Sequence, residues 1–292
     1  MDGSGRARTR THLIAVDGET RRRAEDWLAT EEPLDIRVSA GGADVSVGIT
    51  MRTPGNDFEL AAGFLLSEGI VPSGAAITRI EYCVDKALGH EQQYNQVTVQ
   101  LASEVAPVLP DARRFAISSA CGVCGRGSVD DLVERGLEAL PDGPSMSAEV
   151  ITGLPATMEA RQRVFTSTGG LHAAALFDAE GRLLALREDV GRHNAVDKVL
   201  GWAALNPTSA SSRAVLLVSG RSSFEIVQKC VVGRVATLCA VSAPSSLAVD
   251  LARRFDLTLV GFLRGETFNV YAGERRISAR VADAIRQTSS RA

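Results

Sequence analysis

The second half of the chain alternates helix-like with strand-like segments, and this alternation limits the possible folds more than any other feature. Amphipathic runs each precede a short apolar run, in the pairs 192–205 with 214–218, 223–235 with 237–241, and 245–254 with 257–262. Such alternation predicts a mostly parallel sheet covered by helices on both faces. Around this unit the sequence predicts helices at 128–140 and 148–163, strands at 171–177 and 183–187, and a hairpin arm at 268–271.

The first half predicts a smaller unit that contains a single helix. Strand-like runs occupy residues 34–38, 45–49, 77–84 and 96–101. The first two flank Gly41-Gly42, which indicates a β-hairpin. Apolar residues at helical spacing follow Asn56, which is expected to cap the helix with Glu59 at the third position, and Gly69 ends it.

Together these elements predict an α/β protein in four parts. They are a disordered basic tail over 1–24, a small α+β domain over 25–106, a linker over 107–127 and the larger α/β domain over 128–292. Pro107 and Pro110 mark the linker, which contains a glycine-rich loop with two cysteines.

Composition narrows the function classes. The chain has 292 residues, of which 45% are hydrophobic, so it can bury a sizeable core. Its formal net charge of -3 disfavours a general nucleic-acid or membrane-surface binder. We find no membrane-span-sized apolar run and no signal-peptide pattern at the start, so a cytoplasmic protein is expected.

Loops at the predicted carboxyl ends of the strands are rich in groups that bind phosphate. Ser219 and Arg221 follow one strand, residues 242–246 follow the next, and residues 262–267 follow the last. Helix-start N–H groups, serine hydroxyls and arginines are typical phosphate ligands. Phe262 adds a stacking surface for a base. The serines are equally well explained as ordinary helix N-caps, because serine is a preferred residue at that position.

The loop Cys121-Gly122-Val123-Cys124 carries the most specific chemistry. Two thiols at this spacing close a redox disulfide, supply half a zinc site or carry reactive sulfur. A zinc deaminase that included His172 would need a general acid two residues later, where this chain has Ala174. The pair also lies outside the context of a thioredoxin motif, which leaves sulfur carriage by persulfide exchange. The remaining cysteines are predicted to be small core residues: Cys83, Cys230 and Cys239.

Taken together, the motifs between residues 26 and 272 resemble the formate dehydrogenase accessory sulfurtransferases, the FdhD family. The matching segments are Met51–Gly55, Gly63–Leu65 with Glu68–Ile70, Cys121–Gly125, Thr168–His172, Asp189–Lys198, Ser219–Glu225, Ala243–Ala248 and Gly261–Arg264. The resemblance implies a three-layer, cytidine-deaminase-like C-terminal domain that has no deaminase activity. It also implies a homodimer.

The same resemblance implies the chemistry of a sulfurtransferase-type accessory protein. Sulfur would pass from a cysteine desulfurase, as a persulfide on Cys121, to the molybdenum or tungsten bis-molybdopterin guanine dinucleotide cofactor that formate dehydrogenase then receives. Cys124 would be a second essential thiol, and GDP would mimic the nucleotide end of the cofactor. Besides Ser219 and Arg221, the expected cofactor contacts are Phe262, Leu263, Arg264, Gly265, Glu266 and Thr267.

Two other hypotheses stay open at the level of sequence. One is a non-catalytic chaperone that delivers the cofactor and holds a structural metal between the two thiols, although the chain shows no second ligand pair at zinc-finger spacing. The other is a hydrolase that modifies a free nucleotide. No resident metal ion is predicted.

Overall fold

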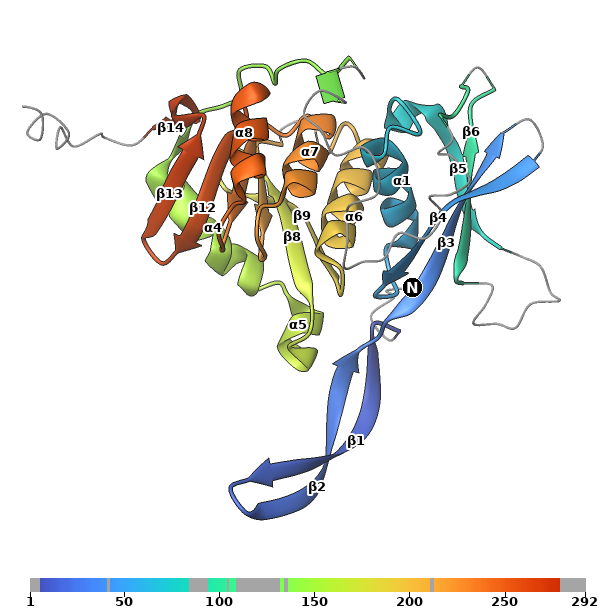
Figure 1. The fold of residues 1–292 in the computed structure, drawn as a ribbon, viewed down its shortest axis with the longest axis vertical. Coiled ribbons are helices and arrows are strands. Elements are labelled where there is room, and N and C mark those ends of the chain that lie inside the picture. The colour runs from blue at the N-terminus through green and yellow to red at the C-terminus, as the bar shows by residue number, and fades with distance from the viewer. Residues whose placement is uncertain are drawn as a thin grey trace, which may run out of the picture.

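The structure is a computed structural model, and it describes residues 6–40, 43–83, 94–103, 105–108, 132–133, 136–210 and 213–278. Figure 1 shows a layered α/β body, a smaller sheet beside it, and a hairpin that projects from the body. Helix α1 of the smaller part lies next to α6 of the larger part, so the two parts meet along a pair of helices.

The smaller part has the predicted order of strand, strand, helix, strand, strand. Its elements are β3 (Glu32–Ala40), β4 (Ala43–Arg52), α1 (Asp57–Ser67), the 3-10 turn η2 (Gly74–Ala76), β5 (Ile77–Tyr82) and β6 (Gln96–Leu101). The sheet order is β4-β3-β6-β5, in which β3 and β6 are parallel and the outer pairs are antiparallel. Leu60, Phe64 and Leu65 of α1 pack with alternate residues of β3 and β6 into one core.

The predicted position of the α1 N-cap is confirmed, but the predicted capping hydrogen bonds are absent. Asn56 occupies the N-cap position, but its backbone is left-handed (φ 58°) and its side chain makes no capping hydrogen bond. Glu59 does not complete a capping box, because its carboxylate binds the guanidinium of Arg187 at 2.6 Å instead. Long-range pairing with the larger part therefore replaces the local cap.

The larger part contains the predicted alternation of helices and strands. Its main elements are α4 (Ala148–Glu159), α5 (Arg163–Thr168), β8 (His172–Phe177), β9 (Leu183–Asp189), α6 (Arg192–Leu205), β10 (Val215–Val218), α7 (Phe224–Val232), β11 (Thr237–Ala240), α8 (Ser246–Arg254), β12 (Thr258–Arg264) and β13 (Thr267–Ala272). A short pair, β7 (Met146–Ser147) with β14 (Ile277–Ser278), lies beside the sheet, and η4 (Glu274–Arg276) precedes β14.

The prediction of a mostly parallel sheet is wrong. The strand order is β13-β12-β11-β10-β8-β9, and within it only β10 with β11 and β11 with β12 are parallel pairs. The pairs of β8 with β10, β8 with β9 and β12 with β13 are antiparallel. Because β8 and β9 form a hairpin with no crossover helix between them, one of them must run against its neighbours.

Helices cover both faces of this sheet, as predicted. Alternate residues of β10 point to opposite sides: Leu216 and Val218 join α6, α7 and α8 in one core, whereas Val215 and Leu217 join α4 in another. Period-two alternation of this kind places a fully apolar strand between two helical layers. The result is a three-layer arrangement.

The two parts meet where α1 crosses α6, and two glycines make this close approach possible. A Cβ atom on Gly63 would lie 1.9 Å from the Asp197 carbonyl oxygen, and one on Gly201 would lie 1.8 Å from the Glu59 carbonyl oxygen. Real Cβ atoms do not approach backbone this closely, so both positions require glycine.

Two predicted segments need correction. Residues 1–24 are not a disordered tail throughout, because β1 (Arg8–Asp17) and β2 (Thr20–Ala29) form an antiparallel hairpin. The helix predicted over 128–140 does not extend to Leu140, since residues 137–140 have no helical structure. Residues 109–131, with most of the predicted linker, lie outside the described residues.

Candidate functional site

The structure separates the cysteines into different environments. Cys230 and Cys239 are fully buried in the two cores, and burial raises the pKa of the Cys239 thiol to about 12. Burial also raises the pKa of Cys230, and Cys83 is half-buried. The prediction of core cysteines is thus confirmed for Cys230 and Cys239.

Neither motif thiol can be placed. Cys121 and Cys124 both lie outside the described residues, so their part in a site remains a prediction from sequence.

Five turns meet at one edge of the six-stranded sheet. The antiparallel register pairs His172 with Asp189 and Val218 with Ala174, so the start of β8 lies beside the ends of β9 and β10. The parallel register then brings the ends of β11 and β12 to the same edge. The loops predicted to bind phosphate therefore do lie at a common edge, together with the turn that enters α6.

Main-chain hydrogen bonds connect these loops to one another. The Ser222 N–H donates to the Ala243 carbonyl oxygen at 3.3 Å, and the Phe262 N–H donates to the Ser242 carbonyl oxygen at 3.1 Å. Arg264 adds a side-chain contact, because its Nε donates to the Val241 carbonyl oxygen at 3.1 Å. The loops after β10, β11 and β12 form a connected surface.

The predicted cofactor segment 262–267 is mostly exposed. The Phe262 ring is 41% exposed and its backbone is left-handed (φ 53°), which interrupts the ladder of β12 with β13. Leu263 differs, because its side chain is fully buried in the core under α4 and can offer a ligand only backbone atoms. The other four residues of the segment are exposed: Arg264, Gly265, Glu266 and Thr267.

The other two predicted contacts lie at the end of β10. Ser219 bridges two strands, because its Oγ accepts a hydrogen bond from the Ala173 N–H at 2.9 Å. Its hydroxyl proton is still available to a ligand. Arg221 is exposed at the same turn.

A group of buried polar atoms without partners lies behind this exposed surface. Within the described residues, no hydrogen-bond partner reaches Arg192 Nε, His193 Nε2, Ser222 Oγ or Ser223 Oγ. All belong to the turns that start α6 and α7. His172 lies close by, since a Cβ on Gly220 would be 3.6 Å from His172 Nδ1 and 3.9 Å from Arg192 Cδ. Buried polar atoms are normally paired with protein groups or with ordered water, so such a group is a candidate place for bound water or a ligand.

Helix capping does not account for these serines. The Ser245 hydroxyl accepts from the Ala248 N–H at 3.3 Å and caps α8 in the ordinary way. Ser223 occupies the same position before α7, yet its side chain makes no capping hydrogen bond. Sequence alone does not distinguish the two serines, because both precede a helix. Arg192, His193 and Ser222 are absent from the predicted site residues, since only the folded arrangement shows that their polar atoms lack partners among the described residues.

A buried network holds the turn that carries Arg192 and His193. Asp189 is fully buried, pairs with Lys198 Nζ at 2.7 Å and accepts from the Gly191 N–H at 2.8 Å. The oxygen that pairs with Lys198 also accepts from the Thr53 N–H at 3.1 Å, and Asn194 donates to the Met51 carbonyl oxygen at 2.7 Å. Residues of the smaller part thus fix the turn at the sheet edge.

His193 is expected to make folding stability depend on pH. Burial, followed by the positive charges of Lys229 and Arg192, lowers the pKa of His193 to about 4, although Glu225 opposes the shift. In the unfolded chain this imidazole binds a proton with a pKa near 6.5, whereas in the folded chain it stays neutral until the pH is much lower. The contribution of His193 to the free energy of unfolding is therefore fully present above about pH 6.5 and declines on acidification. We expect a contribution of about 2 kcal/mol to be lost between pH 7 and pH 5.

Urea unfolding at the two pH values tests this, with His193→Gln as the comparison. The variant should lose less stability on acidification than the parent by that amount. An equal loss in both proteins would contradict the assignment. Burial also lowers the pKa of His172, and this second contribution of the same sign remains in the variant.

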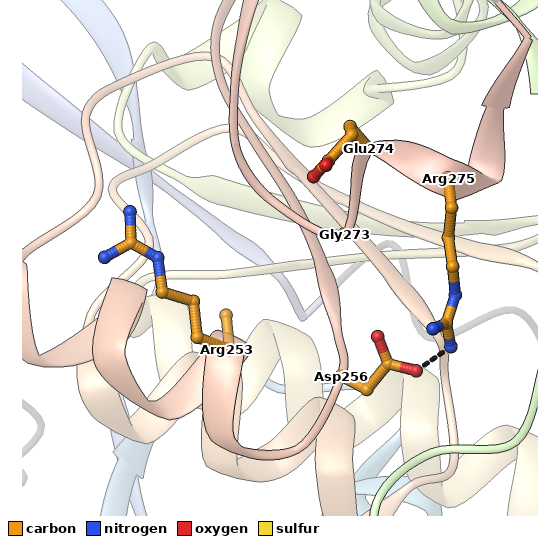
Figure 2. Close-up of a pocket in the computed structure, with 6 residues that line it drawn as sticks. Arg253, Asp256, Gly273, Glu274 and Arg275 are labelled. Carbon is orange, nitrogen blue, oxygen red and sulfur yellow. Dashed lines mark hydrogen bonds and ion pairs between the residues drawn. The ribbon is translucent and has the colours of Figure 1, made fainter.

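A separate pocket of about 260 Å³ lies at the opposite edge of the sheet, between the end of α8 and η4. Figure 2 shows Arg253 on one side of it and the ion pair of Asp256 with Arg275 on the other. Gly273 of this pocket lies against Thr258, the first residue of β12. The pocket contains none of the predicted site residues.

Among the residues that the structure describes, no cluster of three or more His, Cys, Asp or Glu side chains could hold a metal ion. The helices of that part of the chain are also too short or too polar to cross a membrane.

Comparisons with known proteins give a consistent result. The profile of the FdhD/NarQ family matches residues 29–278. A sulfur carrier protein FdhD from Streptomyces avermitilis is 49% identical over 96% of this chain and 99% of its own length. One from Thermoplasma volcanium is 42% identical over 87% of this chain and 90% of its own.

The fold has a counterpart among solved structures. A crystal structure from Desulfotalea psychrophila, of a protein classed as a formate dehydrogenase accessory protein, superposes with a TM-score of 0.73 at 25% identity. The match covers 93% of this chain and 99% of the other. With a family profile that spans most of the sequence and relatives that match almost end to end, the chain belongs to the FdhD/NarQ family.

Proposed function

We propose that this protein is a sulfur carrier in the maturation of formate dehydrogenase. It accepts sulfur from a cysteine desulfurase as a persulfide on Cys121 and transfers it to a molybdenum or tungsten bis-molybdopterin guanine dinucleotide cofactor before that cofactor enters the enzyme. The observation that carries the proposal is the near full-length similarity to proteins named sulfur carrier protein FdhD.

The environments of the other cysteines support the choice of thiol. Cys230 and Cys239 are fully buried, and their raised pKa values keep them protonated and unreactive at neutral pH. Three thiols remain for exchange with a donor protein: Cys83, Cys121 and Cys124. The last two have the spacing in which one thiol carries sulfur and the second assists its release.

The sheet edge supports the choice of acceptor. Phe262 offers an exposed ring on which a guanine base can stack, while Arg221 and Arg264 supply positive charge for phosphate oxygens. In this proposal the cofactor is a bound substrate, its nucleotide end contacts residues 262–267, and GDP imitates that end. The protein works in the cytoplasm as a homodimer.

The three-layer larger part suggests a cytidine-deaminase-like fold in which deamination has been lost. Ala174 is fully buried within β8 and stands where a deaminase places its general acid. An alanine methyl group cannot transfer a proton, so we assign sulfur transfer rather than deamination to this fold.

Replacement of Cys121 by alanine tests the proposal. Incubation of the parent protein with a cysteine desulfurase and cysteine should add about 32 Da, the mass of one sulfur atom, and a reductant should remove it. Cys121→Ala should gain nothing, whereas Cys83→Ala, which removes a half-buried thiol elsewhere, should be labelled like the parent. Intact-protein mass spectrometry reads both.

Normal labelling of Cys121→Ala would refute the assignment. Metal analysis of the same preparations separates the chaperone hypothesis from it, because that hypothesis requires one zinc per chain that is lost from Cys121→Ala.

A further inference from the structure

Arg192 is a partly buried cation that lacks the pairing found at other buried charges. Arg52 pairs with Asp57 at 2.9 Å, Lys198 with Asp189 at 2.7 Å, and Lys229 with Asp197 at 2.8 Å. Within the described residues, Arg192 has neither an ion pair nor a hydrogen bond, and its Nε is buried. Because Arg192 is partly exposed and only its Nε is buried, the guanidinium still meets water, and an anion that reached it would supply the pairing that the other cations already have.

The groups around Arg192 are suited to an anion as well. Ser222 is fully buried, and neither its Oγ nor the buried Oγ of Ser223 has a partner among the residues that the structure describes. Helices α6 and α7 both begin here, and neither has a side-chain cap, so the N–H groups of their first turns point away from the helices without a capping acceptor. Two helix N-termini and an arginine make the local potential positive.

The charged groups near this place include two carboxylates, Glu225 and Asp189, of which Asp189 acts on His172 but is paired with Lys198. His172 and His193 are neutral at pH 7, because burial lowers both pKa values. Lys229 is held by Asp197. The Glu225 carboxylate lies 3.9 Å from His193 Nε2, and its negative charge weakens the site.

We propose that Arg192, Ser222 and Ser223, together with the first turns of α6 and α7, bind a phosphate-class oxyanion. This deepens the proposed function and rests on it for the natural source of the anion, a phosphate group of the guanine nucleotide end of the cofactor. The site lies deeper than segment 262–267: Ser222 has no exposed surface, whereas Phe262 and Arg264 face solvent.

Titration calorimetry of the full chain with inorganic phosphate, GDP and guanosine at pH 7.5 tests the proposal. Inorganic phosphate and GDP should bind, and GDP should bind more tightly than guanosine. Arg192→Gln should weaken phosphate and GDP binding by about 10-fold to 100-fold, as expected for a lost charge-assisted hydrogen bond. Glu225→Gln should strengthen phosphate binding by up to about fivefold, because it removes a repelling charge.

Two further variants keep the test decisive. Ser222→Ala removes one buried hydroxyl with little change of volume, so it should also weaken phosphate binding if Arg192→Gln proves unstable. Arg253→Gln alters an exposed arginine at the opposite edge of the sheet and should bind phosphate like the parent.

The outcomes separate this inference from the proposed function. Equal phosphate affinity in the parent, Arg192→Gln and Ser222→Ala, or no phosphate binding by the parent, would overturn the anion site and would show that the buried groups hold water only. Persulfide labelling at Cys121 would be unaffected by that result. Loss of labelling specificity at Cys121 with phosphate binding intact would instead overturn the sulfur-carrier assignment alone.

Discussion

Gly201→Ala is expected to destabilise the protein by about 3 kcal/mol, near the upper end of the usual cost of overpacking. The new methyl group would lie 1.8 Å from the Glu59 carbonyl oxygen and 2.7 Å from the Gly63 nitrogen. All these atoms are backbone, so no side chain can rotate away, and α1 and α6 have to separate. Separation would also stretch the buried hydrogen bonds that connect the two parts.

Gly153→Ala is the matched control, since Gly153 also lies within a helix, α4, but a Cβ there would meet no atom within 4 Å. Alanine is favoured over glycine in a helix, so this variant should gain up to about 1 kcal/mol. Urea unfolding of both variants measures the two changes. A Gly201→Ala protein as stable as the parent would show that the helices do not cross as closely as described.

Asp189→Asn is expected to cost about 3–5 kcal/mol, because it leaves the Lys198 ammonium buried without its counter-charge. Both side chains are at most 1% exposed. The loss is a large fraction of the usual stability of a domain, about 5–15 kcal/mol. The amide also replaces one acceptor of the hydrogen bonds from Gly191 and Thr53 by a donor, so the turn that carries Arg192 should lose order.

Two comparisons isolate the buried charge. Glu81→Gln breaks the surface pair of Arg79 with the partly exposed Glu81 and should change stability by no more than about 1 kcal/mol. Addition of Lys198→Met to Asp189→Asn removes the unpaired charge and should restore part of the lost stability in urea unfolding. If the double variant is no more stable than Asp189→Asn, the buried charge is not the cause of the loss.

The order of the elements could be predicted from sequence because local signals determine it. Apolar spacing after Gly191 predicted a helix over 192–205, and the structure has α6 at those residues. The direction of a strand relative to its neighbours is harder to predict than the order of the elements. The apolar pattern of β8 is the same whether its neighbour is parallel or antiparallel. The turn over residues 178–181 predicts that the strands at 171–177 and 183–187 are joined directly. The prediction of a mostly parallel sheet overlooked that such a pair is antiparallel, and β8 also runs antiparallel to β10.

The hairpin of β1 with β2 was missed for a related reason. Most residues of its strands are exposed, and the half-buried face of β1 consists of Thr11, Leu13 and Ala15. Since β2 begins with a run of arginines, little apolar periodicity indicates the hairpin. Ile14, Val16, Trp27 and Leu28 remain between 40% and 63% exposed. The hydrophobic pattern that identifies strands reports a buried face, and this hairpin has little of one in the described chain.

In the candidate site, too, local features could be predicted and long-range contacts could not. The exposed edge loops could be predicted, since glycine, serine and arginine after a strand have a recognisable chemistry. Whether each polar group has a partner could not be predicted, because the partners come from distant segments. Glu59 binds Arg187 instead of capping α1, and Lys198 forms an ion pair with Asp189 instead of binding a ligand. Only the folded arrangement shows that Arg192 is left without a carboxylate among the described residues.

The buried network between the two parts has a mechanical consequence. Lys198 binds the Thr53 carbonyl oxygen at 2.8 Å while it pairs with Asp189, and Asn194 binds the strand β4 on the other side. A displacement of the end of β4 cannot leave the turn before α6 in place without breaking several of these bonds. These bonds hold the end of β4 and the turn before α6 in one relative position, so the small sheet helps to set the geometry of the edge loops.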